Sequence, residues 1–253
     1  MSSPPPLAVR EQLREQRFEK VWSQELNDAF ADVAPYYDRA NVFASFGLWN
    51  SLLQSFMSVI ELHPGERTLD VCAGTNAVGI ALLRREPSLE VHAIDRSAAM
   101  QVVGKQRAQA LGFNIGSTIG DVHVLPFPDN HFDVVTLQWA SRHLRVKDVF
   151  SEIHRVLKPG GRFFHCDMLR PANPTVERIY YAYLRVCLSL TSLMFRSNSA
   201  AKSLRTYFID ALEMFYSADE LSEVLRGLGY CDVSSKTRMA GTIGFHRAVK
   251  PAA

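Results

Sequence analysis

The chain has 253 residues, of which 47% are apolar and 21% charged, and its formal net charge is +2. This length and composition fit one soluble globular domain with a sizeable core. The charge is too evenly balanced for a nucleic-acid-binding protein, in which basic residues cluster on one face.

The N-terminal segment is expected to form a helical cap. Residues 1–8 contain three consecutive prolines and are expected to be disordered. The first 20 residues have no apolar stretch and mix glutamate with arginine, which is unlike a signal or transit peptide. Apolar residues recur at helical spacing over residues 9–30, and two shorter helices are expected around Gly47. We therefore assign residues 9–62 to this cap.

Strands and helices alternate from residue 63 onward. The expected strands lie near 68–72, 90–95, 117–121, 132–138 and 162–167, and the expected helices near 77–86, 97–111 and 146–157. The KPGGR sequence at 158–162 is interpreted as a helix stop and a turn. This alternation predicts a doubly wound, mostly parallel sheet with helices on both faces, in a cofactor-binding core over residues 63–170.

The last part of the chain is expected to add a lid and an antiparallel strand pair. A helical insert covers about 174–215, within a lid assigned to residues 171–216. A helix at 217–228 and strands at 230–236 and 242–249 then complete the unit 217–253. The most apolar run, residues 180–195, has 16 residues and includes Arg185, whereas a membrane-spanning helix needs about 20 apolar residues. This run is either a core-facing helix or a lid over a lipid tail that touches a membrane surface.

The cysteines and histidines do not have the spacing of metal ligands. The cysteines Cys72, Cys166, Cys187 and Cys231 form no CxxC pair, and the histidines form no HExxH motif. We expect no metal, and we expect the cysteines to be reduced and buried, as is typical of a cytoplasmic protein.

The segment 68–95 is typical of a nucleoside-binding βαβ unit. Gly74 is expected to let a ligand approach the backbone, the alternative being an ordinary turn glycine. Asp95 follows it by 21 residues, close to the spacing of about 20 at which an acid binds ribose hydroxyls. Asp70 is interpreted as binding the ligand's ammonium group or making a loop hydrogen bond. Asp121, after the third strand, can reach an adenine amino group or cap its own loop.

The combination of LDVCAGT, ID, GD, LPFPDNHFD and RVLKPGG resembles the class I S-adenosylmethionine-dependent methyltransferase fold. More specifically, the chain resembles the ubiquinone/menaquinone biosynthesis C-methyltransferase family in three further stretches: VAPYYDRANVFASFG, LQWASRH and MAGTIGFHRAVK. The match runs from about Val33 to Lys250. The resemblance implies a seven-stranded Rossmann-like fold, S-adenosylmethionine as cofactor, and a prenylated benzoquinol or naphthoquinol precursor as acceptor of a C-methyl group.

The resemblance also assigns residues to the two halves of the site. With the residues singled out above, the predicted cofactor-binding set is Asp70, Gly74, Thr75, Asp95, Arg96, Asp121, Val122 and Gln138. Tyr37 and Arg142 are expected at the reacting face. We hypothesise that His143, or a water held by Arg142, takes the proton of the acceptor hydroxyl while Arg142 stabilises the phenolate. The alternative is that His143 only caps a loop.

The chain departs from the family pattern at several positions. The glycines that flank Gly74 in DxGxGxG are Cys72 and Asn76 here, although asparagine tolerates a left-handed backbone better than other non-glycine residues. The His-Arg-x-Trp block is missing, Arg-Asn has become Arg142-His143, and a glutamate has become Asp167.

These departures keep two alternatives open. The chain could act with S-adenosylmethionine on another small aromatic or polyketide-like acceptor, or modify the quinone ring without methyl transfer. It could also be a non-catalytic S-adenosylmethionine-binding subunit. A homodimer and peripheral contact with the membrane are further expectations, whereas no nucleic-acid partner is expected.

Overall fold

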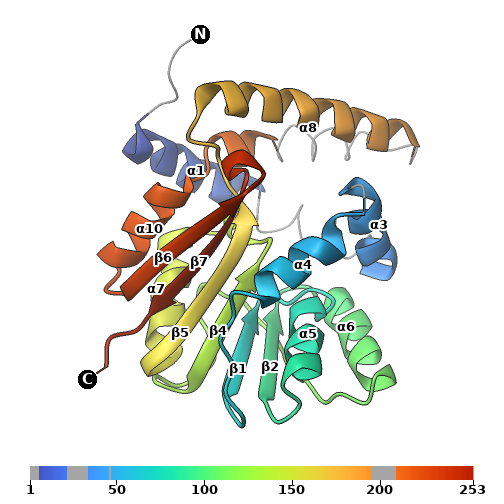
Figure 1. The fold of residues 1–253 in the computed structure, drawn as a ribbon, viewed down its shortest axis with the longest axis vertical. Coiled ribbons are helices and arrows are strands. Elements are labelled where there is room, and N and C mark those ends of the chain that lie inside the picture. Colours follow the sequence, from blue (N-terminus) through green and yellow to red (C-terminus); the bar gives the residue numbers. More distant parts are fainter. Residues whose placement is uncertain (1–5, 22–33, 46, 195–208, 253) are drawn as a thin grey trace.

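Residues 6–21, 34–45, 47–194 and 209–252 are described by the computed structural model (Figure 1). Within them, seven strands form one sheet in the order β3-β2-β1-β4-β5-β7-β6. The strands are β1 (Arg67–Val71), β2 (Glu90–Asp95), β3 (Gly116–Ile119), β4 (Phe132–Gln138), β5 (Leu157–Met168), β6 (Cys231–Arg238) and β7 (Ile243–Val249). The first five are parallel, and β7 is antiparallel to both of its neighbours. The predicted doubly wound sheet with a terminal antiparallel pair is confirmed.

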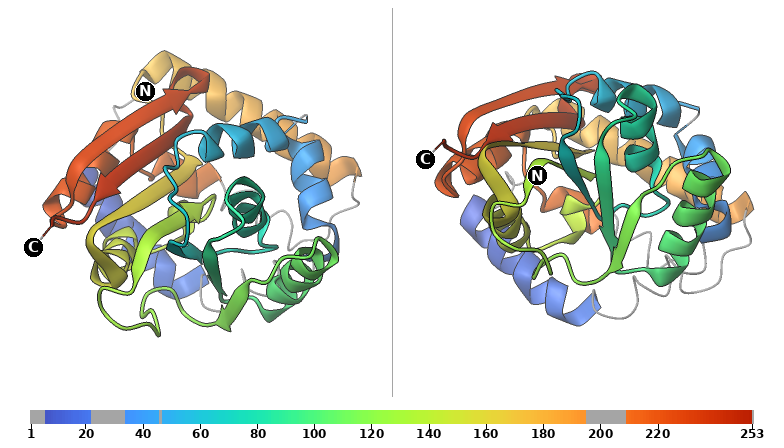
Figure 2. Two further views of the ribbon diagram at one scale, coloured as in Figure 1. Left: turned by 60° about the horizontal axis from the view of Figure 1, so that its bottom comes forward. Right: turned by 90° about the horizontal axis from the view of Figure 1, so that it is seen from below.

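Helices cover both faces of the sheet (Figures 1 and 2). One face carries α4 (Trp49–Met57), α5 (Ala77–Arg85) and α6 (Ala98–Ala110), which share a buried cluster with the strands. The other face carries α7 (Val146–Val156) and α10 (Ala218–Gly227), which share a second buried cluster. The central strands are therefore covered on both sides, and four of the five residues of β1 and five of the seven residues of β4 are buried.

The segment KPGG lies in a strand, which differs from the predicted turn. The β5 strand begins at Leu157 and includes Lys158 to Gly161. Two backbone hydrogen bonds cause this: Gly160 N–H donates to Lys250 O, and Lys250 N–H donates to Gly161 O, both at 2.9 Å. The glycine at 160 adopts a φ of +76°, so the chain bends where the helix ends and still continues the ladder.

The N-terminal helix α1 (Leu7–Val21) is fastened to the start of α10. Ser217 and Glu220 form a capping box there, in which Glu220 accepts the Ser217 backbone N–H at 2.8 Å. The buried Arg10 forms an ion pair with the same Glu220 and donates to Phe215 O at 2.6 Å. The helix begins at Leu7, two residues earlier than predicted. The expected disorder of residues 1–5 and the expected helix beyond residue 21 lie outside the described residues.

Two helical segments lie at the end of the sheet toward which the parallel strands point. These are α3 (Tyr37–Ala44) and α8 (Pro174–Met194), with α8 running along the top of Figure 1. Part of the expected insert, residues 195–208, lies outside the described residues, and residues 209–213 are again helical. In the described part of the chain, no helix has the length and apolarity needed to cross a membrane.

None of the four cysteines, all of which lie in the described part of the chain, forms a disulfide, and they are not all buried. Cys166 is buried, Cys72 and Cys187 are partly buried, and Cys231 is exposed. Cys231 lies on β6, which is the edge strand of the sheet that the described residues form, and the prediction of burial is wrong for it.

Candidate functional site

The turn after β1 has a left-handed backbone at three alternating positions. Cys72, Gly74 and Asn76 have φ values of 56°, 52° and 58°. Gly74 N–H donates to Asp95 Oδ2 at 2.8 Å, and Ser97 N–H donates to Asp95 Oδ1 at 2.8 Å. A Cβ placed on Gly74 would meet no protein atom within 4 Å, so the space above this glycine is open. The turn and the acid that were predicted from spacing therefore face one another across neighbouring strands.

Asn76 keeps the backbone of the turn in the conformation that a glycine would adopt. It is wholly buried and precedes α5 as its N-cap residue. Gln101 Nε2 on α6 donates to Asn76 Oδ1 at 3.1 Å and to Gly74 O at 3.0 Å. A Cβ on Gly104 would lie 2.8 Å from the carbonyl carbon of Thr75, and α6 can therefore pack directly on the turn. Sequence reasoning missed Gln101 and Gly104, although a glycine inside a helix is a signal of close packing.

A polar cluster ties α3 to the same turn. Thr75 Oγ1 donates to Asp38 Oδ1 at 2.9 Å, and Arg107 on α6 forms an ion pair with Asp38. Arg107 Nη1 also donates to Thr75 Oγ1 at 3.1 Å and to Thr75 O at 3.2 Å. These contacts fix the start of α3, and Tyr37 is thereby placed next to the turn.

Three aromatic side chains continue from this point. The ring of Tyr37 meets Trp49 edge-on with centroids 6.4 Å apart, and Trp49 stacks on Trp139 with centroids 5.8 Å apart. Trp139 follows β4 directly and has a φ of 59°, which is strained for a bulky residue. Strained backbone is common at functional sites. The strain at Trp139 therefore indicates that the end of β4 belongs to the same site as the turn after β1.

Three buried polar atoms around the turn and β4 have no hydrogen-bond partner in the described chain. They are Asp70 Oδ2, Asn76 Nδ2 and Gln138 Nε2. The other carboxylate oxygen of Asp70 accepts from Thr136 Oγ1 at 2.8 Å. An unpaired buried polar atom costs about 1–3 kcal/mol, and these atoms therefore indicate a polar ligand. A carboxylate suits an ammonium group and two amide donors suit a carboxylate, which together fit the amino-acid part of S-adenosylmethionine.

Burial makes two carboxyl groups of the site harder to ionise. Burial raises the pKa of Asp70 to about 7, and burial also raises the pKa of Asp95. A ligand that is cationic or donates hydrogen bonds would therefore stabilise the ionised form of both carboxyl groups.

The adenine side of the predicted set is more open. Asp121 lies two residues beyond β3, where its Oδ1 accepts the backbone N–H of His123 at 3.0 Å and contacts His123 Nδ1 at 2.6 Å. Asp121 thus caps its own loop, as one alternative predicted. Val122 beside it is buried, and Arg96 after β2 is exposed.

Arg142 is held in place by Asp167 at the end of β5. Asp167 is wholly buried, forms an ion pair with the Arg142 side chain, and accepts the Arg142 backbone N–H at 3.1 Å. Ser141 Oγ donates to Asp167 Oδ2 at 2.7 Å and lies 2.7 Å from His165 Nε2. Ser141 and His165 were not predicted, because nothing in their sequence spacing links β4 to β5.

The histidines near this ion pair are buried and uncharged at neutral pH. His165 Nδ1 lies 3.3 Å from His246 Nδ1, and His246 Nε2 lies 3.0 Å from Ala218 O. Burial lowers the pKa of His246 to about 4. Burial and the neighbouring charge of Arg142 hold the pKa of the buried His143 well below its usual value. His143 is therefore a weak base.

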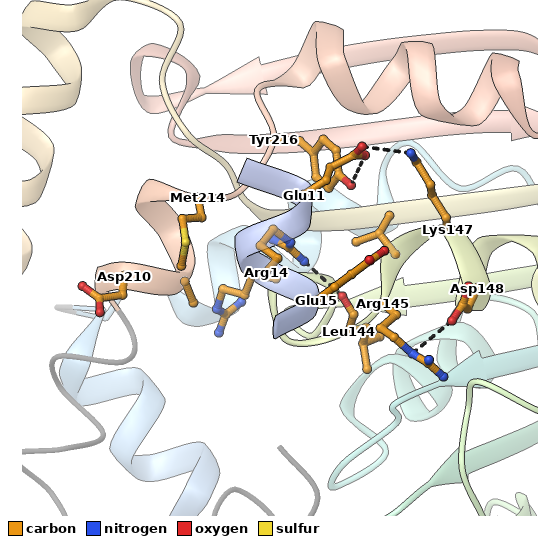
Figure 3. Close-up of a pocket in the computed structure, with 13 residues that line it drawn as sticks. Glu11, Arg14, Glu15, Leu144, Arg145, Lys147, Asp148, Asp210, Met214 and Tyr216 are labelled. Carbon is orange, nitrogen blue, oxygen red and sulfur yellow. Dashed lines mark hydrogen bonds and ion pairs between the residues drawn. The ribbon is translucent and has the colours of Figure 1, made fainter. Parts of the chain in front are cut away.

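Two cavities adjoin these residues. The cavity in Figure 3 has a volume of about 60 Å³, lies between α1 and the segment after β4, and is lined in part by Arg142. Glu11 accepts there from Tyr216 at 2.8 Å and from Lys147 at 2.9 Å. This volume holds only a few waters. A groove of about 740 Å³ runs between α3, α4, α5 and α6 and is lined by Asp38, Trp49 and Arg107.

Comparisons with known proteins show which family and which fold the chain resembles. A sequence model of the ubiE/COQ5 methyltransferase family matches residues 18–250. The demethylmenaquinone methyltransferase of Geobacillus kaustophilus is 32% identical over 232 residues, which are 90% of this chain and 97% of that protein. The ubiquinone/menaquinone biosynthesis C-methyltransferase UbiE of Cereibacter sphaeroides is 28% identical, covering 89% of this chain and 90% of that protein.

Among solved structures, Haemonchus contortus phosphoethanolamine N-methyltransferase 2 in complex with S-adenosyl-L-methionine is similar with a TM-score of 0.63. The match covers 88% of this chain and 60% of that chain at 17% identity. At this identity the likeness shows the fold.

Proposed function

The chain belongs to the ubiE/COQ5 methyltransferase family, and from this premise we propose that it transfers a methyl group from S-adenosylmethionine to a ring carbon of a prenylated naphthoquinol or benzoquinol. It is a methyltransferase with the S-adenosylmethionine cofactor of its family. The acceptor class follows from the names of its relatives, which are a demethylmenaquinone methyltransferase and a ubiquinone/menaquinone C-methyltransferase. The observation that carries the proposal is the buried Arg142–Asp167 pair, which lies at the same end of the parallel sheet as the turn assigned to the cofactor.

The residues around the turn would hold the cofactor, which supplies an electrophilic methyl group on a sulfonium. Asp95 would accept from its ribose hydroxyls and Asp70 from its ammonium group, while Gln138 and Asn76 would donate to its carboxylate. Gly74 and Thr75 would lie along its backbone-facing side, and Arg96, Asp121 and Val122 would line the adenine side.

The acceptor would react beside Arg142. The new bond joins the methyl group to a ring carbon, the sulfur–methyl bond breaks, and the ring carbon finally loses its proton to water. A ring carbon becomes nucleophilic when the neighbouring hydroxyl is ionised, and the cationic Arg142 stabilises that phenolate. The charge of Arg142 also acts on the phenol of Tyr37, which supports the placement of both at the reacting face.

Of the two proton acceptors suggested by the sequence, a water held by Arg142 fits better than His143. A base works best when its pKa is close to the working pH. Burial lowers the pKa of His143 well below 6.5, so its capacity to accept a proton is small.

We also propose that the enzyme contacts the membrane surface through α8. Its outer face exposes Ile179, Tyr183 and Val186 to 66%, 47% and 59%, at spacings of four and three residues. Arg178 and Arg185 are exposed on the same helix. An apolar stripe beside basic residues is typical of helices that lie in the interface of anionic membranes, where a prenylated acceptor is found. Flotation with anionic liposomes tests this: wild-type protein is expected to float, and a variant with Ile179→Glu and Val186→Glu is expected to stay behind.

The methyl transfer itself is tested with purified protein, S-adenosylmethionine and a reduced prenylated quinol whose neighbouring ring carbon is free. Mass spectrometry is expected to find a product heavier by one methyl group. In a deletion strain, the quinone pool is expected to contain a species lighter by one methyl group. A normal quinone pool would contradict the proposal. If calorimetry detects no binding of S-adenosylmethionine, any reaction that depends on this cofactor is contradicted.

A further inference from the structure

Tyr180 on α8 carries a buried hydroxyl group that has no hydrogen-bond partner among the described residues. Its side chain is 9% exposed, and its Oη is among the buried polar atoms without a partner. Few buried polar groups are left unpaired in native proteins, since each costs about 1–3 kcal/mol. The unpaired hydroxyl can therefore donate to a bound ligand where the surrounding groups favour one.

The surroundings of Tyr180 are apolar on one side and charged on the other. Its ring packs in a buried cluster with Leu184, Ile209 and Leu212, and Met168 lies against this cluster. Met168 follows Asp167 directly, and the charges of Arg142 and Asp167 both act on the Tyr180 phenol. Burial raises the pKa of this phenol, so the hydroxyl keeps its proton and can donate it in a hydrogen bond.

We propose that Tyr180 is an acceptor-binding residue whose hydroxyl donates a hydrogen bond to the ring oxygen that Arg142 stabilises. The inference rests on the proposed function, because it assumes a phenolic acceptor at Arg142. No proton is transferred in this contact. A hydrogen bond to a charged oxygen is stronger than one to a neutral oxygen, and Tyr180 therefore favours the ionised acceptor.

This role has a kinetic signature. Loss of a hydrogen bond to an anion raises the pKa of the bound acceptor, so the rise of kcat with pH moves to higher pH. A hydrogen bond to a charged group contributes about 1.5–3 kcal/mol, which corresponds to a shift of at least about one pH unit.

Tyr181 provides a matched control on the same helix. It is also buried, at 5% exposure, and its Oη also lacks a partner. The charges that act on its phenol are those of Glu177, Glu213 and Arg170, rather than those of Arg142 and Asp167. Tyr181→Phe therefore removes an equivalent buried hydroxyl, which belongs to the same cluster as Tyr180 but is not acted on by the charges of Arg142 and Asp167.

The experiment compares Tyr180→Phe, Tyr181→Phe and the wild type. Replacing an unpaired hydroxyl by an apolar group is near neutral, so both variants should keep or raise their melting temperature. Binding of a reduced prenylated naphthoquinol is measured by tryptophan fluorescence in the presence of S-adenosylhomocysteine. Tyr180→Phe is expected to weaken this binding about tenfold, in line with a loss of about 1.4 kcal/mol. It should also shift the pH profile of kcat upward by about one unit, while Tyr181→Phe behaves as the wild type.

Each outcome decides between the two proposals. Equal quinol binding and equal pH profiles for the two variants would overturn the role of Tyr180, and methylation by the wild type would leave the proposed function intact. If the wild type binds the quinol without methylating it, the methyl transfer is wrong, and the ratio of dissociation constants still decides the role of Tyr180. A wild type that binds no quinol overturns both.

Discussion

Arg142 and Asp167 are joined by both the side chain and the backbone of the arginine. The wholly buried carboxylate of Asp167 forms an ion pair with the guanidinium and accepts the Arg142 backbone N–H at 3.1 Å. Ser141 Oγ and the Met168 N–H also donate hydrogen bonds to the carboxylate of Asp167, each at 2.7 Å. Four donors on one carboxylate orient Arg142 before any acceptor arrives, and such preorganisation is what an electrostatic stabiliser requires.

Asp167→Asn is expected to lower both stability and turnover. The variant leaves the Arg142 charge in a buried position without its counter-charge, which typically costs about 3–5 kcal/mol. Urea denaturation measures this loss, and kcat is expected to fall at least about tenfold. Asp148→Asn is the control, because its ion pair with Arg145 at 3.0 Å is half-exposed and should contribute at most about 1 kcal/mol. Equal stability of the two variants would contradict the importance of the buried pair.

Asn76→Ala is expected to destabilise the protein more than Asn76→Gly. Both variants lose the hydrogen bond to Gln101, which contributes about 1 kcal/mol. The alanine variant must also adopt the φ of 58° that this position requires, at about 1–2 kcal/mol more, whereas glycine adopts it freely. The order of the two unfolding free energies in urea tests this, and an alanine variant as stable as the glycine variant would show that the turn relaxes.

Binding of S-adenosylmethionine is expected to tighten as the pH rises through 7. The pKa of Asp70 is raised by burial to about 7, so the carboxyl is mostly protonated at pH 6 and ionised at pH 8. Only the ionised form attracts the ammonium group, and the affinity should therefore rise about tenfold over this range. Calorimetry at several pH values measures the change, and Asp70→Asn should lose the dependence while binding weakly throughout.

The same ionisation has the opposite effect on the ligand-free protein. The pKa of Asp70 is higher in the folded than in the unfolded chain, where it is about 3.9. The folded state therefore binds more protons between pH 4 and 7, and this group's contribution to stability falls as the pH rises through that window.

His143→Gln is expected to leave the pH profile of turnover unchanged. Burial already keeps His143 uncharged across the working range, and its low pKa makes it a weak proton acceptor. Glutamine retains a polar side chain of similar size, so a loss of turnover below about threefold is expected from small changes in packing. If the fall of turnover at low pH disappears in this variant, His143 is the general base.

Acid is expected to unfold the protein partly through His246. Its pKa is about 4 in the folded protein, against about 6.5 in the unfolded chain. The unfolded state therefore binds more protons between these values, and stability is complete above pH 6.5 and falls as the pH decreases toward 4. At pH 5 the loss from this group is about 2 kcal/mol. Urea denaturation at pH 5 and 7 should show a smaller difference for His246→Gln than for His63→Gln, whose exposed side chain is the control.

The alternation of strands and helices, and the contact between the turn after β1 and the acid at the end of β2, could be predicted from the sequence, since both depend on local patterns. Alternating strands and helices impose a parallel sheet, and the carboxyl ends of parallel strands meet at one edge. Gly74 follows β1 and Asp95 ends β2, so both were expected at this edge of the sheet. The 2.8 Å hydrogen bond between them confirms their contact. Asn76 adopted the left-handed backbone that its side chain tolerates.

The tertiary structure alone decided which side chains surround Arg142. Asp167 and His165 lie on β5 and Ser141 follows β4, and these two segments meet only because β4 and β5 are paired in one register. The unpaired hydroxyl of Tyr180 likewise appears only once α8 packs over the end of β5. A sequence pattern records the periodicity of each element, but the partners of a buried polar group depend on how distant elements pack. The sequence alone therefore determined the fold and, through its family resemblance, the class of cofactor, whereas packing decided which groups surround Arg142.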